Sequence, residues 1–218
     1  MAKKKSISQT DLTRFYMDYV LLHDHKPKSV YAFAKDNNFD ESKFYEFFSS
    51  FEGLEQSIFK VFFDNTYNAL EKSEDYQNFD PQNKLLSFYF TFFENLTANR
   101  SYIVHALKGN KNDMKSLRVL SQVKKSFNNY IEHLGIKLID VQQDQLQIIQ
   151  TRGLTESAWF QLLVTMKFWL DDTSTSFEKT DIFIEKSVRA SFDLIDITPL
   201  KSIIDFGKFL FKEKMQMN

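Results

Sequence analysis

Apolar residues recur at intervals of three or four positions along most of the chain, which is the spacing of an amphipathic helix. A first helix is predicted over residues 10–22. Ser29 and Asp40 suit the N-caps of two short helices, which a turn at Asn37 and Asn38 separates. No segment alternates apolar and polar residues as a half-buried strand does, so the pattern predicts an all-α fold.

Larger helices are predicted in the rest of the chain. Ser49 and Glu52 have the spacing of a capping box and open a fourth helix. Asp80 followed by Pro81 is typical of a helix start, and the helix that follows to about Lys108 is apolar nearly all round, so we expect it to be buried. Further helices are expected over 114–134 and 136–151, from Thr155, over 179–196 and from Thr198.

The composition restricts the class of protein. With 24 Phe and 9 Tyr but only 5 Gly and 3 Pro, the chain should form long helices around an aromatic core or an aromatic-lined cavity. The absence of Cys excludes disulfides and Cys-based zinc sites. No apolar run reaches the roughly 20 residues of a membrane helix, and the basic N-terminus is followed by polar residues rather than by a signal sequence. A soluble, cytoplasmic protein is the expectation.

A regular pattern of residue types runs from the second helix into the fourth. A hydroxyl and an apolar residue open the second helix, an apolar residue and Ala follow, and the third helix carries a Tyr and an aromatic pair. The positions are Ser29, Val30, Phe33, Ala34, Phe39, Asp40, Phe44, Tyr45, Phe47, Phe48 and Leu54. This pattern resembles the DNA-binding signature of the TetR/AcrR family of transcriptional regulators.

The resemblance implies a two-part architecture. Residues 1–53 would form a three-helix, homeodomain-like helix-turn-helix domain, and residues 54–218 a helical ligand-binding and dimerisation domain. It implies a transcriptional regulator that binds double-stranded DNA as a homodimer and responds to a small molecule. The pattern of the third helix agrees with this interpretation. It predicts an outer side of polar residues that could contact base edges, and an inner side formed by Phe44, Phe47 and Phe48. The expected DNA contacts are Lys28, Ser29, Glu41, Ser42, Lys43 and Tyr45.

An alternative function stays open because of charge. Residues 29–60 contain three lysines and six carboxylates, a net charge of −3, although the first 28 residues carry +3. Phe51 stands where the family usually has a phosphate-binding Lys just before its fourth helix. Neutralisation of DNA phosphates by basic residues supplies most non-specific DNA affinity, so a negatively charged segment is poorly suited to bind DNA. The alternative is therefore a TetR-fold protein that binds lipids or isoprenoids and whose helix-turn-helix no longer binds DNA.

The larger domain is expected to hold an apolar or amphipathic effector. Tyr, His and Trp side chains among apolar walls are the usual lining of a small-molecule site, although an aromatic stripe is also ordinary core. The candidate lining residues are Tyr89, Phe92, Tyr102, His105, Trp159 and Trp169.

The last two helices resemble, by position, the dimerising pair of the family. A two-fold symmetric protein would also match a palindromic operator. The candidate interface residues are Val188, Phe192, Ile195, Phe206 and Phe209, whose alternative role is to complete the core of one chain.

Catalytic and metal chemistry finds little support. His23 and His25 flank Asp24, but the loop offers no third His, so a solvated loop is favoured over a metal site. No carboxylate pair, Gly-rich phosphate loop or Ser–His arrangement has catalytic spacing. We therefore expect no enzymatic activity, no cofactor and no metal.

Overall fold

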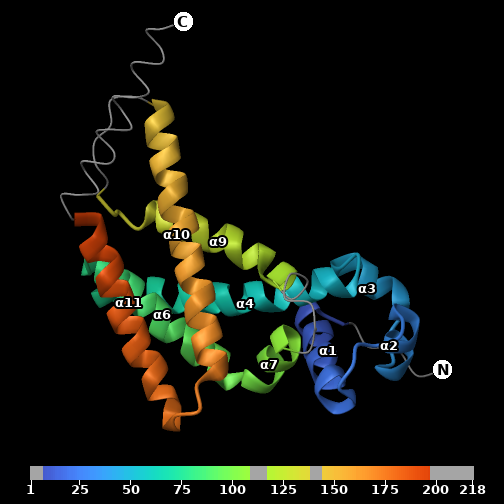
Figure 1. Ribbon diagram of the computed structural model, residues 1–218. Coiled ribbons are helices and arrows are strands. Elements are labelled where there is room, and N and C mark those ends of the chain that lie inside the picture. Colours follow the sequence, from blue (N-terminus) through green and yellow to red (C-terminus); the bar gives the residue numbers. More distant parts are fainter. Residues whose placement is uncertain (1–6, 109–116, 138–143, 197–218) are drawn as a thin grey trace, which may run out of the picture. The chain divides into compact units, whose positions relative to one another are not determined.

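The computed structural model describes residues 7–108, 117–137 and 144–196 of the 218-residue chain (Figure 1), and every regular element among them is helical. The all-α prediction is therefore confirmed. The elements are α1 Gln9–His23, α2 Val30–Asp36, α3 Glu41–Phe47, α4 Phe51–Glu71, α5 Glu74–Asn78, α6 Pro81–Ala98, α7 Arg100–Lys108, η1 Leu117–Leu120, α9 Ser121–His133, α10 Asp144–Asp171, η2 Thr175–Phe177 and α11 Glu178–Asp196. None of the helices in the described ranges combines the length and the hydropathy of a membrane-spanning segment.

The chain divides into two compact units. The first consists of residues 1–68 and 92–126, and the second of 69–91 and 127–218. The helices α4, α6 and α9 each contribute residues to both units. The functional boundary that the sequence places after residue 53 stays a prediction.

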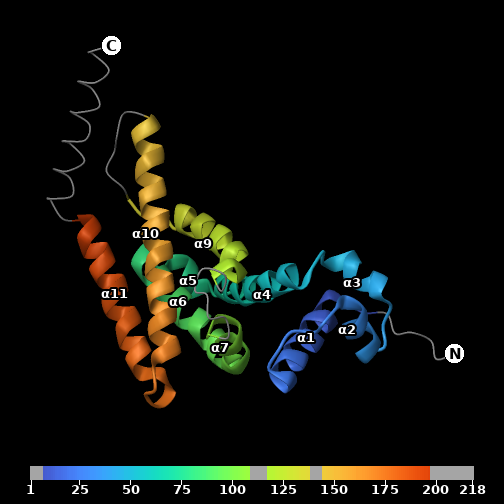
Figure 2. The same cartoon turned by 45° about the vertical axis from the view of Figure 1, so that its right-hand side comes forward.

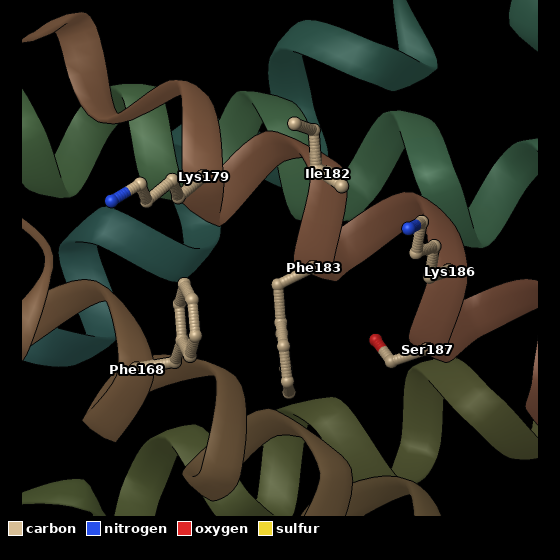
Figure 3. A pocket seen from close by; sticks show the side chains of 6 residues that line it. All are labelled: Phe168, Lys179, Ile182, Phe183, Lys186 and Ser187. Atoms are coloured by element: carbon tan, nitrogen blue, oxygen red, sulfur yellow. The ribbon is translucent and has the colours of Figure 1, made fainter. Parts of the chain in front are cut away.

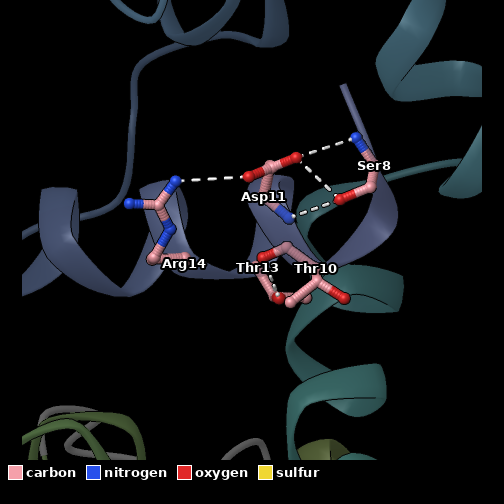
Figure 4. Close-up of polar contacts among 5 residues, drawn as sticks. All are labelled: Ser8, Thr10, Asp11, Thr13 and Arg14. Carbon is pink, nitrogen blue, oxygen red and sulfur yellow. Dashed lines mark hydrogen bonds and ion pairs between the residues drawn. The ribbon is translucent and has the colours of Figure 1, made fainter. Parts of the chain in front are cut away.

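A capping box fixes the start of α1. The Ser8 hydroxyl oxygen accepts a hydrogen bond from the Asp11 amide at 3.2 Å, and the Asp11 carboxylate accepts one from the Ser8 amide at 3.1 Å (Figure 4). The Ser8 hydroxyl also donates to the Asp11 carboxylate at 2.7 Å. This bond, the bond from the Ser8 amide and the Arg14 guanidinium 3.2 Å from the same carboxylate lower the pKa of Asp11. The helix therefore begins one residue before the predicted Thr10.

An aromatic cluster forms the interior beneath α2 and α3. The Phe33 ring lies edge-on to Phe44 and to Phe51, with ring centroids 6.3 and 5.7 Å apart, and Phe51 stacks on Tyr16 of α1 at 5.4 Å. Phe33, Phe44 and Tyr16 are fully buried. The inward placement predicted for Phe47 is wrong, because α3 ends at this residue and its side chain is 40% exposed.

Several helix limits differ from the prediction because polar side chains act locally. The fourth helix starts at Phe51, since Ser50 rather than Ser49 caps it by accepting from the Gly53 amide at 3.2 Å. The helix predicted to run to Lys108 is interrupted at Asn99, whose side-chain amide donates to the Asn95 carbonyl.

Two further differences concern whole helices. Thr155 starts no helix, because its hydroxyl donates to the Arg152 carbonyl inside the continuous α10. The short α5, capped by Ser73, was not predicted. The helix predicted from Thr198 lies outside the described residues, and so does Met114, the predicted start of the helix over 114–134.

Within the second unit, α10 and α11 lie side by side and run antiparallel (Figures 1 and 2). Apolar residues of both helices, including Leu162, Trp169, Ile184 and Val188, are fully buried. At the edge of this contact the Gln161 amide nitrogen donates to Ser187 at 3.3 Å, and its oxygen accepts from Ser191 at 3.1 Å. The pair therefore combines a buried apolar seam with polar bridges that fix its register.

Candidate functional site

The α2–turn–α3 segment has the local geometry of a helix-turn-helix. The Ser29 hydroxyl caps α2 by accepting from the Ala32 amide at 3.1 Å. Asn38 adopts a left-handed conformation with φ of 56°, as the sequence predicted for this turn. Phe39 is buried directly after the turn and helps to hold α3 on α2.

The six predicted DNA-contact residues all have accessible surface on this segment. Lys28 and Ser29 are exposed at the start of α2, and Ser42 and Tyr45 are exposed on α3. Glu41 and Lys43 are half-buried. The segment therefore offers these polar side chains to a partner while Phe44 of the same helix anchors it to the core.

Two features of α3 oppose contact with a polyanion. The Lys43 ammonium is already paired with the Glu46 carboxylate, 2.7 Å away and one helical turn on. The Phe51 ring, at the position where the resemblance implies a phosphate-binding Lys, is half-buried and lies 5.3 Å from the Phe44 ring. A phosphate would have to compete with Glu46 for Lys43 and would find no cation at position 51.

A buried carboxylate on α4 is linked to the loop that precedes α2. The sequence patterns did not indicate it as a candidate residue. Glu55 of α4 is 5% exposed and accepts a hydrogen bond from the Tyr16 hydroxyl at 2.5 Å. Its other oxygen lies 2.8 Å from the Lys26 ammonium. Burial, and after it the Glu55 charge, raises the pKa of Tyr16 far above its usual value. The sequence feature that could have indicated this buried carboxylate is a single Glu on the apolar side of a helix, next to Leu54 and four residues before Phe59.

The predicted effector-lining residues divide between the two compact units. Tyr89, Trp159 and Trp169 belong to the second unit and are buried there. Phe92, Tyr102 and His105 belong to the first, where the first two are buried and His105 is half-buried. The His105 Nε2 atom lies 3.4 Å from the Asp24 carboxylate. Their role as a ligand lining stays a prediction.

An apolar groove of about 470 Å³ opens between α10 and α11 (Figure 3). The Phe168 and Phe183 rings stack at its centre, with centroids 4.5 Å apart and planes inclined by 13°. Ile182, Ser187, Lys179 and Lys186 complete the lining. The apolar pattern gives no sign of this groove, because its residues lie on the outer sides of two helices whose apolar spacing marks only their buried sides.

The residues predicted for the dimer interface differ in how far they are buried. Val188 is fully buried within its own chain, and Phe192 and Ile195 are half-buried. Phe206 and Phe209 lie outside the described residues. On α11, Leu194 is exposed beside these residues, and α10 carries further exposed apolar residues, among them a row spaced by one helical turn: Phe160, Val164 and Phe168. We call this row, together with Ile182 of α11, the α10–α11 apolar face.

Among the described residues, no group of three or more His, Asp or Glu side chains is placed to hold a metal ion. The His23 and His25 rings are 6.0 Å apart, beside the Tyr19 ring.

Comparison with known proteins identifies one family. Residues 84–210, more than half of the chain, match the family model described as "Tetracyclin repressor-like, C-terminal domain". No match was found among curated proteins.

Proposed function

Because the chain belongs to the tetracycline repressor-like family, we propose that it is a transcriptional regulator that binds double-stranded DNA as a homodimer and responds to an apolar or amphipathic small molecule. The observation that carries the proposal is the α2–turn–α3 segment, which has a capped second helix, a left-handed Asn38 and a third helix anchored by Phe44. In such a unit the outward side of the third helix enters the major groove.

The charges assign different roles to the expected contacts. Lys28 and Ser29, at the N-terminus of α2, suit the phosphate backbone, because an exposed cation and helix-terminal amides favour an anion. Ser42 and Tyr45, exposed on α3, suit the bases or the adjoining sugars. Lys43 would have to leave Glu46 in order to bind DNA.

Direct binding tests this proposal. A duplex selected from a random library at low salt should bind the wild-type protein with a salt dependence typical of phosphate contacts. Lys28→Ala should weaken binding to all duplexes alike and reduce the slope of log K against log salt by about 0.9. Lys125→Ala, an exposed Lys on α9, is the matched control and should bind like wild type. Failure to select any preferred duplex would overturn the proposal.

A second candidate function is a TetR-fold protein that binds lipids or isoprenoids and whose helix-turn-helix does not bind DNA. The Lys43–Glu46 pair and the packed ring of Phe51 favour it. Native mass spectrometry of the purified protein distinguishes it, since this function requires a co-purified or readily bound lipid. A protein that binds a selected duplex and carries no lipid would exclude the second candidate.

A further inference from the structure

Glu55 is a charged side chain in a position where most side chains are apolar. It is 5% exposed on α4, between the buried residues Leu54 and Ile58. A buried carboxylate is costly unless charged or polar groups compensate it. Here the compensation comes from Tyr16 of α1, whose hydroxyl donates at 2.5 Å, and from Lys26 in the loop between α1 and α2 at 2.8 Å. One carboxylate thus joins α4 to α1 and to that loop.

The loop that Glu55 holds leads directly to the expected phosphate contacts. Lys26 is followed by Pro27, which is buried and whose ring restricts the backbone. Lys28 and Ser29 come next, and the Ser29 hydroxyl caps the first turn of α2. Because only one residue separates Lys26 from Lys28, the Lys26–Glu55 pair limits where Lys28 and the N-terminus of α2 can lie.

Tyr102 of the helix α7 lies near the same carboxylate. Phe59 lies one helical turn after Glu55 on α4, and its ring centroid is 6.4 Å from that of Tyr102 on α7. Tyr102 is 1% exposed, and its hydroxyl has no hydrogen-bond partner among the described residues. Burial, and after it the Glu55 charge, raises the pKa of Tyr102. Since α7 also packs on α1, the Tyr16–Glu55 bond is buried, where electrostatic interactions are strong. The Lys26 side chain is 49% exposed, so its pair with Glu55 is only partly shielded from water.

We infer that Glu55 is a positioning residue for DNA binding, which holds the loop before α2, and with it Lys28 and Ser29, in register with α1 and α4. This inference rests on the proposed function, because it names a residue that prepares the same DNA-binding surface. Glu55 itself is buried and touches no DNA.

The test compares Glu55→Gln with Asp64→Asn in the full-length protein. Both substitutions remove one carboxylate from α4, but Asp64 forms an exposed pair with Lys60, which contributes little to stability. In Glu55→Gln the backbone amides of Tyr31 to Ala34 should exchange hydrogen about tenfold faster or more, because the loop loses its anchor. Binding to the selected duplex should weaken about tenfold, with a salt slope smaller by about 0.9, since one phosphate contact is lost. Asp64→Asn should leave both measurements at wild-type values.

A second pair of variants tests the positioning role even if Glu55→Gln does not fold. Lys26→Met should reproduce the faster exchange in α2, and Lys26→Arg should restore wild-type exchange, because it keeps a charged donor opposite Glu55. The inference is overturned if the α2 amides of Lys26→Met exchange at the wild-type rate, or if Lys26→Arg is as fast as Lys26→Met. A wild-type protein that binds no duplex would overturn the proposed function, and with it the role of Glu55 in DNA binding. The exchange measurement needs no DNA and would still show whether Glu55 holds the loop.

Discussion

At the scale of single residues, two buried carboxylates organise segments that the apolar pattern leaves undefined. Glu55 fixes the loop before α2, and Asp172 fixes the segment between α10 and α11. Asp172 accepts hydrogen bonds from the amide and hydroxyl of Ser174, at 2.8 and 2.7 Å, and from those of Thr180, at 3.0 and 2.7 Å. Because Thr180 lies in the first turn of α11, Asp172 acts as the cap of that helix.

The Asp172 cap predicts a pH dependence of stability. Burial favours a raised pKa, but the bonds from Ser174 and Thr180 outweigh it and hold the pKa of Asp172 at about 2. An Asp in the unfolded chain has a pKa of about 3.9. The carboxylate therefore stabilises the fold fully above about pH 4, and this contribution is lost as the pH falls from about 4 towards 2.

Urea titrations between pH 6 and 2 measure this contribution. Asp172→Asn should lower the free energy of unfolding by about 1 kcal/mol at pH 6, as loss of a helix cap does, and the difference from wild type should shrink below pH 3. The control is Asp171→Asn, which removes an exposed carboxylate paired with Lys167 and should cost less than about 0.5 kcal/mol. Equal losses in the two variants would contradict the capping role.

At the scale of elements, α10 shows where the apolar pattern is insufficient. The sequence suggested a helix over 136–151 and another from Thr155, but α10 runs unbroken from Asp144 to Asp171. Gly153 lies inside it, and a Cβ atom added there would meet no atom within 4 Å. Gly135, after α9, also has free space around a Cβ position, but its φ is +80°. The two glycines thus differ in backbone conformation and not in crowding.

This difference predicts opposite effects of the same substitution. Gly153→Ala should raise the free energy of unfolding by about 0.5–1 kcal/mol, because Ala favours a helix interior. Gly135→Ala should lower it by about 1 kcal/mol, because a left-handed conformation is unfavourable for Ala. Thermal and urea unfolding of the two variants measures both values. A destabilised Gly153→Ala protein would contradict the continuous helix.

The helix starts that the sequence predicted best are those at which a single capping residue stands directly before the helix. Ser29 before α2 and Asp80 before α6 are such cases, and both accept bonds from the first turn of the following helix. The prediction was weaker wherever tertiary packing decides. Phe47 is exposed because α3 ends there. The two partners of Glu55, Lys26 and Tyr16, precede it in the sequence by 29 and 39 positions, and helical periodicity cannot reveal contacts over such separations.

At the scale of the whole molecule, the proposed function requires two copies of the chain. The α10–α11 apolar face is the proposed site of their contact, because Phe160 is 67% exposed and Ile182 50%, a large apolar surface for helices that otherwise pack closely. Val188, predicted from the sequence for the interface, is fully buried in its own chain.

Substitution of the most exposed residue of this face tests the dimer. Phe160→Glu should raise the dissociation constant of the dimer at least about thirtyfold, since it buries an unpaired charge in place of an aromatic contact. Val61→Glu, at another exposed apolar position on α4, is the matched control and should leave the dimer intact. Analytical ultracentrifugation over a range of concentrations gives both constants. A wild-type monomer, or equal weakening by both substitutions, would exclude this face.

Binding to genomic DNA tests the central claim, that the helix-turn-helix of this family member recognises DNA. The purified protein is mixed at low salt with sheared DNA of its own genome, and the retained fragments are sequenced. A regulator that binds as a two-fold dimer should enrich a small number of discrete sites with palindromic half-sites about 34–36 Å, or a multiple of that distance, apart. Retention that is uniform along the genome, or no retention at all, would contradict the account.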